Sequence, residues 1–155
     1  MKEIVLSSED IAHTIYAGIR HPMTVGDKAS VEKELLDIKE ERKDIEVFIC
    51  DITNEITYTT HKEKLKSNLA NHIYKYNKDA LQALRDSLKT GEHLPAFFEE
   101  KTSTGRYLIY VHLILNNKDC YHCHGSSRKV LGSMVIKINT EQTLADIAST
   151  RNHPC

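Results

Sequence analysis

Five consecutive residues, Cys120-Tyr121-His122-Cys123-His124, constrain this chain more than any other feature. Two thiols separated by two residues are placed to form thioether bonds with the two vinyl groups of haem. A histidine directly after the second thiol can then reach the iron. The motif therefore predicts one covalently attached haem c, with Cys120 and Cys123 as attachment sites and His124 as an axial ligand of the iron.

Two other uses of the cysteines compete with this prediction. A disulfide or a thioredoxin-like redox pair would place Cys120 and Cys123 at a helix start after a strand, and no βαβ pattern surrounds them. A structural zinc site needs four ligands, and no second Cys/His pair stands at a suitable spacing. Cys50 is expected to be a small buried residue of a strand, and Cys155 is a terminal thiol. Haem therefore remains the favoured interpretation.

The second axial position of the iron has several candidates. Met23, which we expect in a loop after Pro22, could turn its thioether toward the iron, or it could be an ordinary apolar anchor of that loop. His21 and water are the alternatives, and Met134 is expected in the core of a strand. The remaining histidines are expected at the surface or partly buried with polar partners, and His122 toward solvent: His13, His61, His72, His93, His112 and His153.

The first part of the chain has helical periodicity. A helix is expected to begin near Ser7 to Asp10 and to place Ile11, Ile15 and Ile19 on one face. Pro22 should end this helix near Arg20, which leaves residues 23–27 as a loop. A second helix is expected over Ala29 to Lys43.

The period then changes to that of strands. A hairpin is expected first, then two helical pieces, then three strands around the cysteine motif and a terminal helix with Leu144 and Ile147 inward. The expected ranges are, in order, Ile45 to Ile49, Ile56 to Thr59, Lys62 to His72, Asp79 to Thr90, Ala96 to Lys101, Arg106 to Leu115, Val130 to Ile138 and Thr140 to Ser149. This order predicts an α+β fold with a five-stranded antiparallel sheet flanked by helices.

Composition indicates one globular domain over residues 1–155, because 40% of the residues are hydrophobic and 28% are charged. The net charge of −1 is spread along the chain without a basic stripe, so we expect no nucleic-acid partner. No apolar run is long enough for a membrane span, and the start turns polar too early for a signal peptide. Covalent haem attachment takes place outside the cytoplasm, so we expect a processed chain or a domain of a longer, extracytoplasmic protein.

The chain resembles the periplasmic PAS-like (Cache-like) haem c sensor domains of bacterial chemotaxis receptors and histidine kinases. Three segments carry the resemblance in order, and together they cover most of the chain: Arg20-His21-Pro22-Met23 with Gly26-Asp27, the Ile45 to Thr60 hairpin, and Cys120 to Gly125 continuing through Arg128 to Gly132. Only the haem motif among them is highly specific.

The resemblance implies a PAS-like sheet with N- and C-terminal helices that run toward a membrane, and Met23 as a labile distal ligand. Such a domain senses redox state or a diatomic gas, NO or CO, for signal transduction. A homodimer is expected through the terminal helices, since the Ile11, Ile15 and Ile19 stripe would be exposed. A monohaem c-type cytochrome for electron transfer is the alternative, although small cytochromes of that kind are mostly helical. No acid/base pair stands beside the motif, so we do not expect an enzyme.

Overall fold

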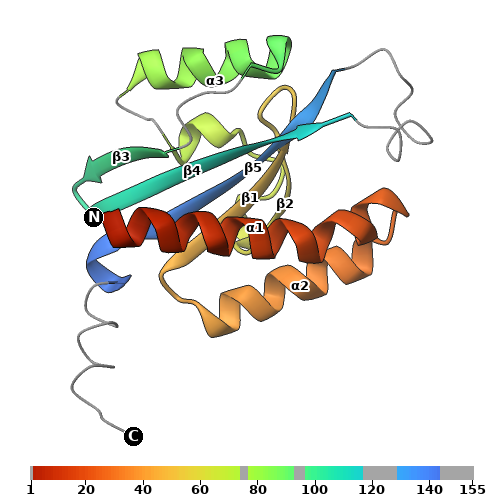
Figure 1. Cartoon of the computed structure of the whole chain (residues 1–155), viewed down its shortest axis with the longest axis horizontal. Coiled ribbons are helices and arrows are strands. Elements are labelled where there is room, and N and C mark those ends of the chain that lie inside the picture. The colour runs from red at the N-terminus through yellow and green to blue at the C-terminus, as the bar shows by residue number, and fades with distance from the viewer. Residues whose placement is uncertain (1, 74–76, 93–96, 117–128, 144–155) are drawn as a thin grey trace, which may run out of the picture.

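The computed structural model describes residues 2–73, 77–92, 97–116 and 129–143. A five-stranded sheet lies between two layers of helix, with α1 (Lys2–Thr24) and α2 (Lys28–Glu41) on one face and α3 (Lys78–Thr90) on the other (Figure 1). The predicted α+β class and the five-stranded antiparallel sheet are thus confirmed.

The sheet has the strand order β2-β1-β5-β4-β3, and every neighbouring pair is antiparallel. The last strand, β5, therefore lies in the centre, between the first strand and the fourth. The bounds are β1 (Ile45–Asp51), β2 (Ile56–Thr59), β3 (Phe97–Thr102), β4 (Gly105–Leu115) and β5 (Val130–Asn139). Each predicted strand is present, with ends that differ from the prediction by no more than two residues.

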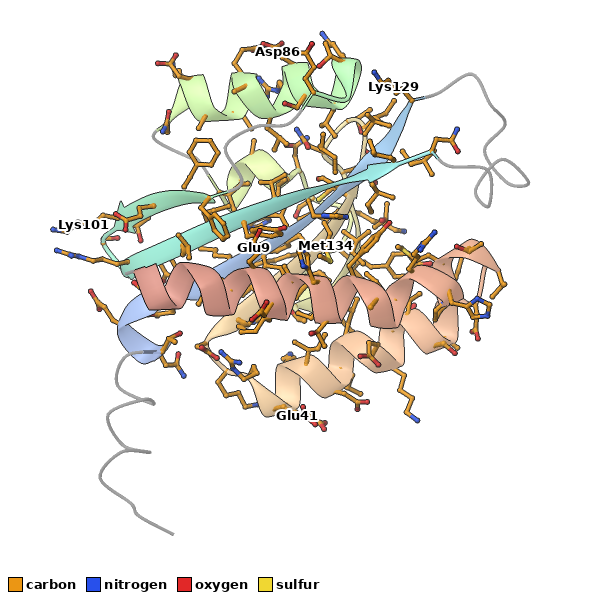
Figure 2. The ribbon with its side chains drawn as sticks, in the orientation of Figure 1. Glu9, Glu41, Asp86, Lys101, Lys129 and Met134 are labelled. Atoms are coloured by element: carbon orange, nitrogen blue, oxygen red, sulfur yellow. The ribbon has the colours of Figure 1, made fainter. Side chains whose placement is uncertain are left out.

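Alternation along the central strands gives the sheet two separate hydrophobic cores. Val47, Met134 and Ile136 point to the α1/α2 face, where they meet Ile15 and Ile19. Phe48 and Val135, which follow Val47 and Met134 in sequence, belong to the opposite core under α3. That second core contains Phe48, Val135, Ile109, Leu84 and Leu88. Figure 2 shows Met134 behind α1, as expected for a core residue with no exposed area.

The first helix differs from the prediction at both ends, since it begins at Lys2 and passes through Pro22 to Thr24. Proline lacks one amide donor, which costs a single hydrogen bond near the end of a helix. The following residues restore the pattern: Val25 donates to the His21 carbonyl at 3.1 Å, and the Thr24 hydroxyl donates to the Arg20 carbonyl at 2.8 Å. The expected loop at residues 23–27 is therefore wrong at Met23 and Thr24, which are helical.

The segment predicted as a helix from Lys62 to His72 is also different. It contains only two short 3₁₀ turns, Lys62–Lys64 and Leu69–Asn71, separated by residues that hydrogen-bond to Ile56 at the start of β2. The predicted end of α3 is confirmed, because Gly91 takes the left-handed conformation at φ 74° and its amide donates to the Ser87 carbonyl. Residues 140–143 begin the predicted terminal helix, while Leu144 and Ile147 lie outside the described residues.

A buried carboxylate anchors this last turn to the sheet. Asp44 accepts two hydrogen bonds from Arg42, at 2.9 and 3.0 Å, and one from the Thr143 hydroxyl at 2.6 Å. Burial raises the pKa of Asp44, but these hydrogen bonds and the Arg42 charge outweigh it, so the pKa is lowered overall. Because the folded-state pKa is the lower one, the stabilisation is present above the unfolded pKa and is lost as pH falls through the folded value.

We expect Asp44→Asn to lower the free energy of unfolding by about 1–3 kcal/mol at pH 7, since charged hydrogen bonds are lost. The gap between variant and wild type should narrow as pH falls below about 4. Urea unfolding at several pH values measures both effects, with the exposed Asp37→Asn on α2 as control. An equal loss at every pH would contradict this account.

Within the described ranges, no helix combines the length and the apolar character that a bilayer crossing requires.

Candidate functional site

A cavity of about 410 Å³ lies between the C-terminal end of α1 and the sheet. It opens where the ends of β1 and β4 and the start of β5 meet. Most of its exposed lining is apolar, and the volume falls in the range of ~300–1,000 Å³ that is usual for small-molecule sites. The lining residues are Tyr16, Arg20, Met23, Thr24, Gly26, Lys28, Ile49, Cys50, Asp51, Thr57, Tyr58, Ile114 and Leu131.

Met23, the candidate ligand from the sequence, lines this cavity. Its side chain is half-buried and packs against the core of the α1/α2 face. Tyr16 and Arg20 share its helix face, because they precede it by seven and three residues. The spacing of Tyr16, Arg20 and Met23 could have predicted this shared helix face from the sequence. It was missed because Pro22 was expected to end the helix before Met23.

Two irregularities of the sheet shape the wall opposite Met23. Thr57 is an extra residue of β2, since Tyr58 pairs with Ile49 and Ile56 with Cys50. Leu131 is an extra residue of β5, since Gly132 pairs with Ile114 and Val130 with Leu115. Both extra residues line the cavity. Bulges bend a strand and redirect its side chains, which is why they are frequent beside functional sites.

The bulge in β5 depends on a very close approach of two backbones. A Cβ atom at Gly132 would lie 2.0 Å from the carbonyl oxygen of Cys50, a distance that no side chain tolerates. Only glycine therefore lets the start of β5 lie against the end of β1 at this point. The position of Cys50 and Asp51 in the cavity wall follows from that contact.

The predicted haem-attachment residues Cys120, Cys123 and His124 lie outside the described residues. The structure does describe both ends of their segment, where the Asn116 amide donates to the Lys129 carbonyl at 3.0 Å. Ile114 and Leu131, just beyond these ends, both line the cavity. Each end of the segment that contains the motif is therefore two residues away from a wall residue of the cavity that Met23 lines.

His21, the alternative axial ligand, lines a different hollow. That hollow, of about 570 Å³, lies outside the helix end and is bounded by Ala17, Arg20, His21, Thr24 and Val25. His21 is exposed there, whereas Met23 is directed to the sheet. The geometry therefore favours Met23 over His21 for any group that occupies the apolar cavity.

The other histidines in the described ranges are exposed or partly buried, as predicted. His13 is exposed, while His61 and His72 hydrogen-bond to Thr60 and Ser67. His112 is half-buried, as predicted, and the centroid of its ring lies 4.4 Å from that of Tyr16, a wall residue. His112 lies on the same face of the sheet as the cavity, and the ring of Tyr16 lies between them.

Cys50 is a free thiol at the cavity wall, 3% exposed, as predicted for a small buried residue. Burial, and secondarily the charge of Asp51, raises the pKa of this thiol to about 12. It therefore stays protonated near neutral pH, and a protonated thiol is a poor metal ligand. Among the residues with described side chains there is no group of three or more His, Cys, Asp or Glu placed to hold a metal ion.

Polar groups at the cavity are placed by the turn and the helix end. Asp51 accepts hydrogen bonds from the Thr53 amide, the Thr53 hydroxyl and the Glu55 amide, at 2.8, 2.6 and 3.0 Å. These bonds fix the β1–β2 turn. Arg20 and Lys28 bring two cationic side chains to the α1 side of the cavity. Apart from Met23, the wall residues were not predicted as site residues.

No protein-family model matches this chain.

Proposed function

We propose that this chain is a haem c-binding, extracytoplasmic sensor domain with a PAS-like fold, which responds to redox state or to a diatomic gas through a change in axial ligation. One observation carries the proposal. The thioether of Met23 lines an apolar cavity together with Ile114 and Leu131, which lie two residues beyond the ends of the segment that contains Cys120-Tyr121-His122-Cys123-His124.

The residues at the cavity suit a haem. A porphyrin is a large apolar ring with two carboxylates, and the wall offers aliphatic and aromatic surface together with Arg20 and Lys28. Cys120 and Cys123 would hold the group covalently, with His124 and Met23 as the axial ligands. A bound haem would supply a redox-active iron that a soft thioether or a diatomic gas can ligate.

Met23 can convey its state to the rest of the domain because it belongs to α1. This helix is continuous over 23 residues and is anchored on the sheet by the buried Ala12, Ile15 and Ile19. Movement of the Met23 side chain in or out of the cavity would change the packing of the last turn of α1. A signal shifts such an equilibrium only by its differential affinity for the two arrangements.

The wider setting of the proposal rests on the sequence resemblance. A five-stranded antiparallel sheet flanked by helices is the architecture that the resemblance implies, and it supports the PAS-like assignment. A membrane-anchored receptor or kinase would then carry this domain. The predicted homodimer rested on the family resemblance and on an exposed apolar stripe of α1. The second reason fails, because Ile15 and Ile19 are 6% and 0% exposed and pack on the sheet. Dimerisation remains a prediction from the family alone.

The role of Met23 is tested by replacing it with Ala. We expect the haem to stay attached, the ferrous absorption spectrum to change as the sixth ligand is lost, and CO to bind faster than in the wild type. Stopped-flow mixing of the reduced protein with CO measures the rate, and His21→Ala is the matched control from the neighbouring hollow. If Met23→Ala leaves the ferrous spectrum unchanged, or if His21→Ala alters it instead, Met23 is not the ligand.

A further inference from the structure

A second cavity, of about 670 Å³, lies on the opposite face of the sheet, between α3, the β1–β2 turn and the start of β5. Three cationic side chains line it: Arg85 and Lys89 from α3 and Lys129 from the residue before β5. Figure 2 shows Lys129 beside the C-terminal end of α3. The lining contains no carboxylate among the residues that the structure describes.

The fold itself explains only part of this cluster. The carbonyl end of α3 attracts Lys89, which lies in its last turn. Arg85 is one turn earlier, and two like charges four residues apart destabilise a helix by about 0.2–0.5 kcal/mol. Within the described residues, neither these two side chains nor Lys129 forms an ion pair with an acid.

The position of Lys129 is set by packing. A Cβ atom at Gly91 would lie 3.1 Å from both Cδ and Cε of Lys129, so the stem of Lys129 rests on this glycine. Gly91 also has a positive φ of 74°, which disfavours any side chain. The Lys129 ammonium is thereby kept near the two cations of α3, although like charges repel.

A buried amide at the same cavity is the independent second observation. Asn54 lines the cavity and is 3% exposed, and its Oδ1 has no hydrogen-bond partner among the described residues. Its backbone is fixed in the left-handed region, at φ 66°, by bonds from the Asn54 amide to Asp51 and from the Leu69 amide to the Asn54 carbonyl. Leaving a buried acceptor unpaired costs about 1–3 kcal/mol, so the site favours a molecule that brings a donor.

We infer that this cavity binds a small hydroxylated oxyanion, such as a hydroxy acid or a hydroxylated phosphate monoester. Its anionic groups face Arg85, Lys89 and Lys129, and its hydroxyl donates to Asn54 Oδ1. A hydroxyl suits this position better than an ammonium donor, because three cations stand around the cavity. The site is separate from the Met23 cavity, and the inference does not depend on haem.

Hydroxymalonate and malonate are matched probes for this site, since both are dianions and only the first carries a hydroxyl. NMR titration of the whole 155-residue chain follows the backbone amides of Asn54, Lys89 and Lys129. We expect saturable shifts with hydroxymalonate and about fivefold weaker binding of malonate, from the loss of one hydrogen bond. Lys78→Gln is the control, because this exposed lysine of α3 does not line the cavity.

Two sets of variants separate the contribution of the cationic side chains from that of Asn54. Arg85→Gln with Lys129→Gln should weaken both probes by about tenfold or more, since charge-assisted hydrogen bonds are lost at surface positions that leave the core intact. Asn54→Gly keeps the left-handed backbone and should remove the preference for hydroxymalonate. The inference is overturned if neither probe gives saturable shifts, if the double variant binds as the wild type does, or if Lys78→Gln weakens binding equally. Equal affinity of the wild type for the two probes would contradict the inferred hydrogen bond from a ligand hydroxyl to Asn54 Oδ1.

Discussion

Replacing both Cys120 and Cys123 with Ala is expected to abolish covalent haem attachment completely, because no other thiol stands in the attachment pattern. The test needs export of the full chain in a host that matures c-type cytochromes. Mass spectrometry of the denatured protein then shows whether the mass of one haem stays with the polypeptide. Either single replacement should leave one thioether at most and shift the absorption of the reduced protein.

Cys50→Ala is the matched control, since this buried thiol lines the Met23 cavity but lies outside the motif. It should keep a full complement of covalent haem. A wild-type chain that carries no haem after maturation, or a double variant that still carries it covalently, would contradict the assignment of the motif.

Gly132→Ala should be the most destabilising single change that the described part of the chain suggests. Its Cβ would lie 2.0 Å from the Cys50 carbonyl oxygen, which belongs to a backbone paired on both sides in the sheet. Neither strand can move without loss of ladder hydrogen bonds, so we expect a loss of about 3 kcal/mol in the free energy of unfolding. Urea unfolding followed by circular dichroism measures it.

Gly18→Ala on α1 is the control for this prediction. Its Cβ would lie 3.0 Å from Oε1 of Glu34, the far end of a flexible side chain that can move away. Alanine in a helix interior is favoured over glycine by about 0.5–1 kcal/mol, so stability should stay the same or rise slightly. If Gly132→Ala unfolds at the same urea concentration as the wild type, the close approach of β1 and β5 is not a constraint.

The elements with strong periodicity could be predicted from the sequence, and the exceptions have physical causes. The hairpin, the three later strands and α3 follow from alternation, turn residues and Gly91. Lys62 to His72 was wrongly assigned to a helix, because backbone bonds of residues 66 and 67 with Ile56 hold that segment against β2. Such tertiary pairing overrides local propensity and leaves no local signal.

The candidate site could be predicted only in part. Met23 could be predicted from its thioether. Its cavity could not, because the cavity depends on the β-bulges at Thr57 and Leu131. A single extra residue in a strand does not visibly change the hydrophobic pattern of the sequence. Pro22 also concealed the shared face of Tyr16, Arg20 and Met23. The cation cluster with Asn54 combines residues far apart in the chain, so it required the fold.

The visible spectrum of the purified protein in the oxidised, reduced and CO-treated reduced states tests the central claim most directly. The account predicts the bands of a single haem c, a six-coordinate reduced iron in the wild type, and a shift when CO displaces Met23. A spectrum without haem bands would contradict the cofactor. Haem bands that remain six-coordinate and unchanged under CO would contradict the sensor and favour an electron-transfer cytochrome.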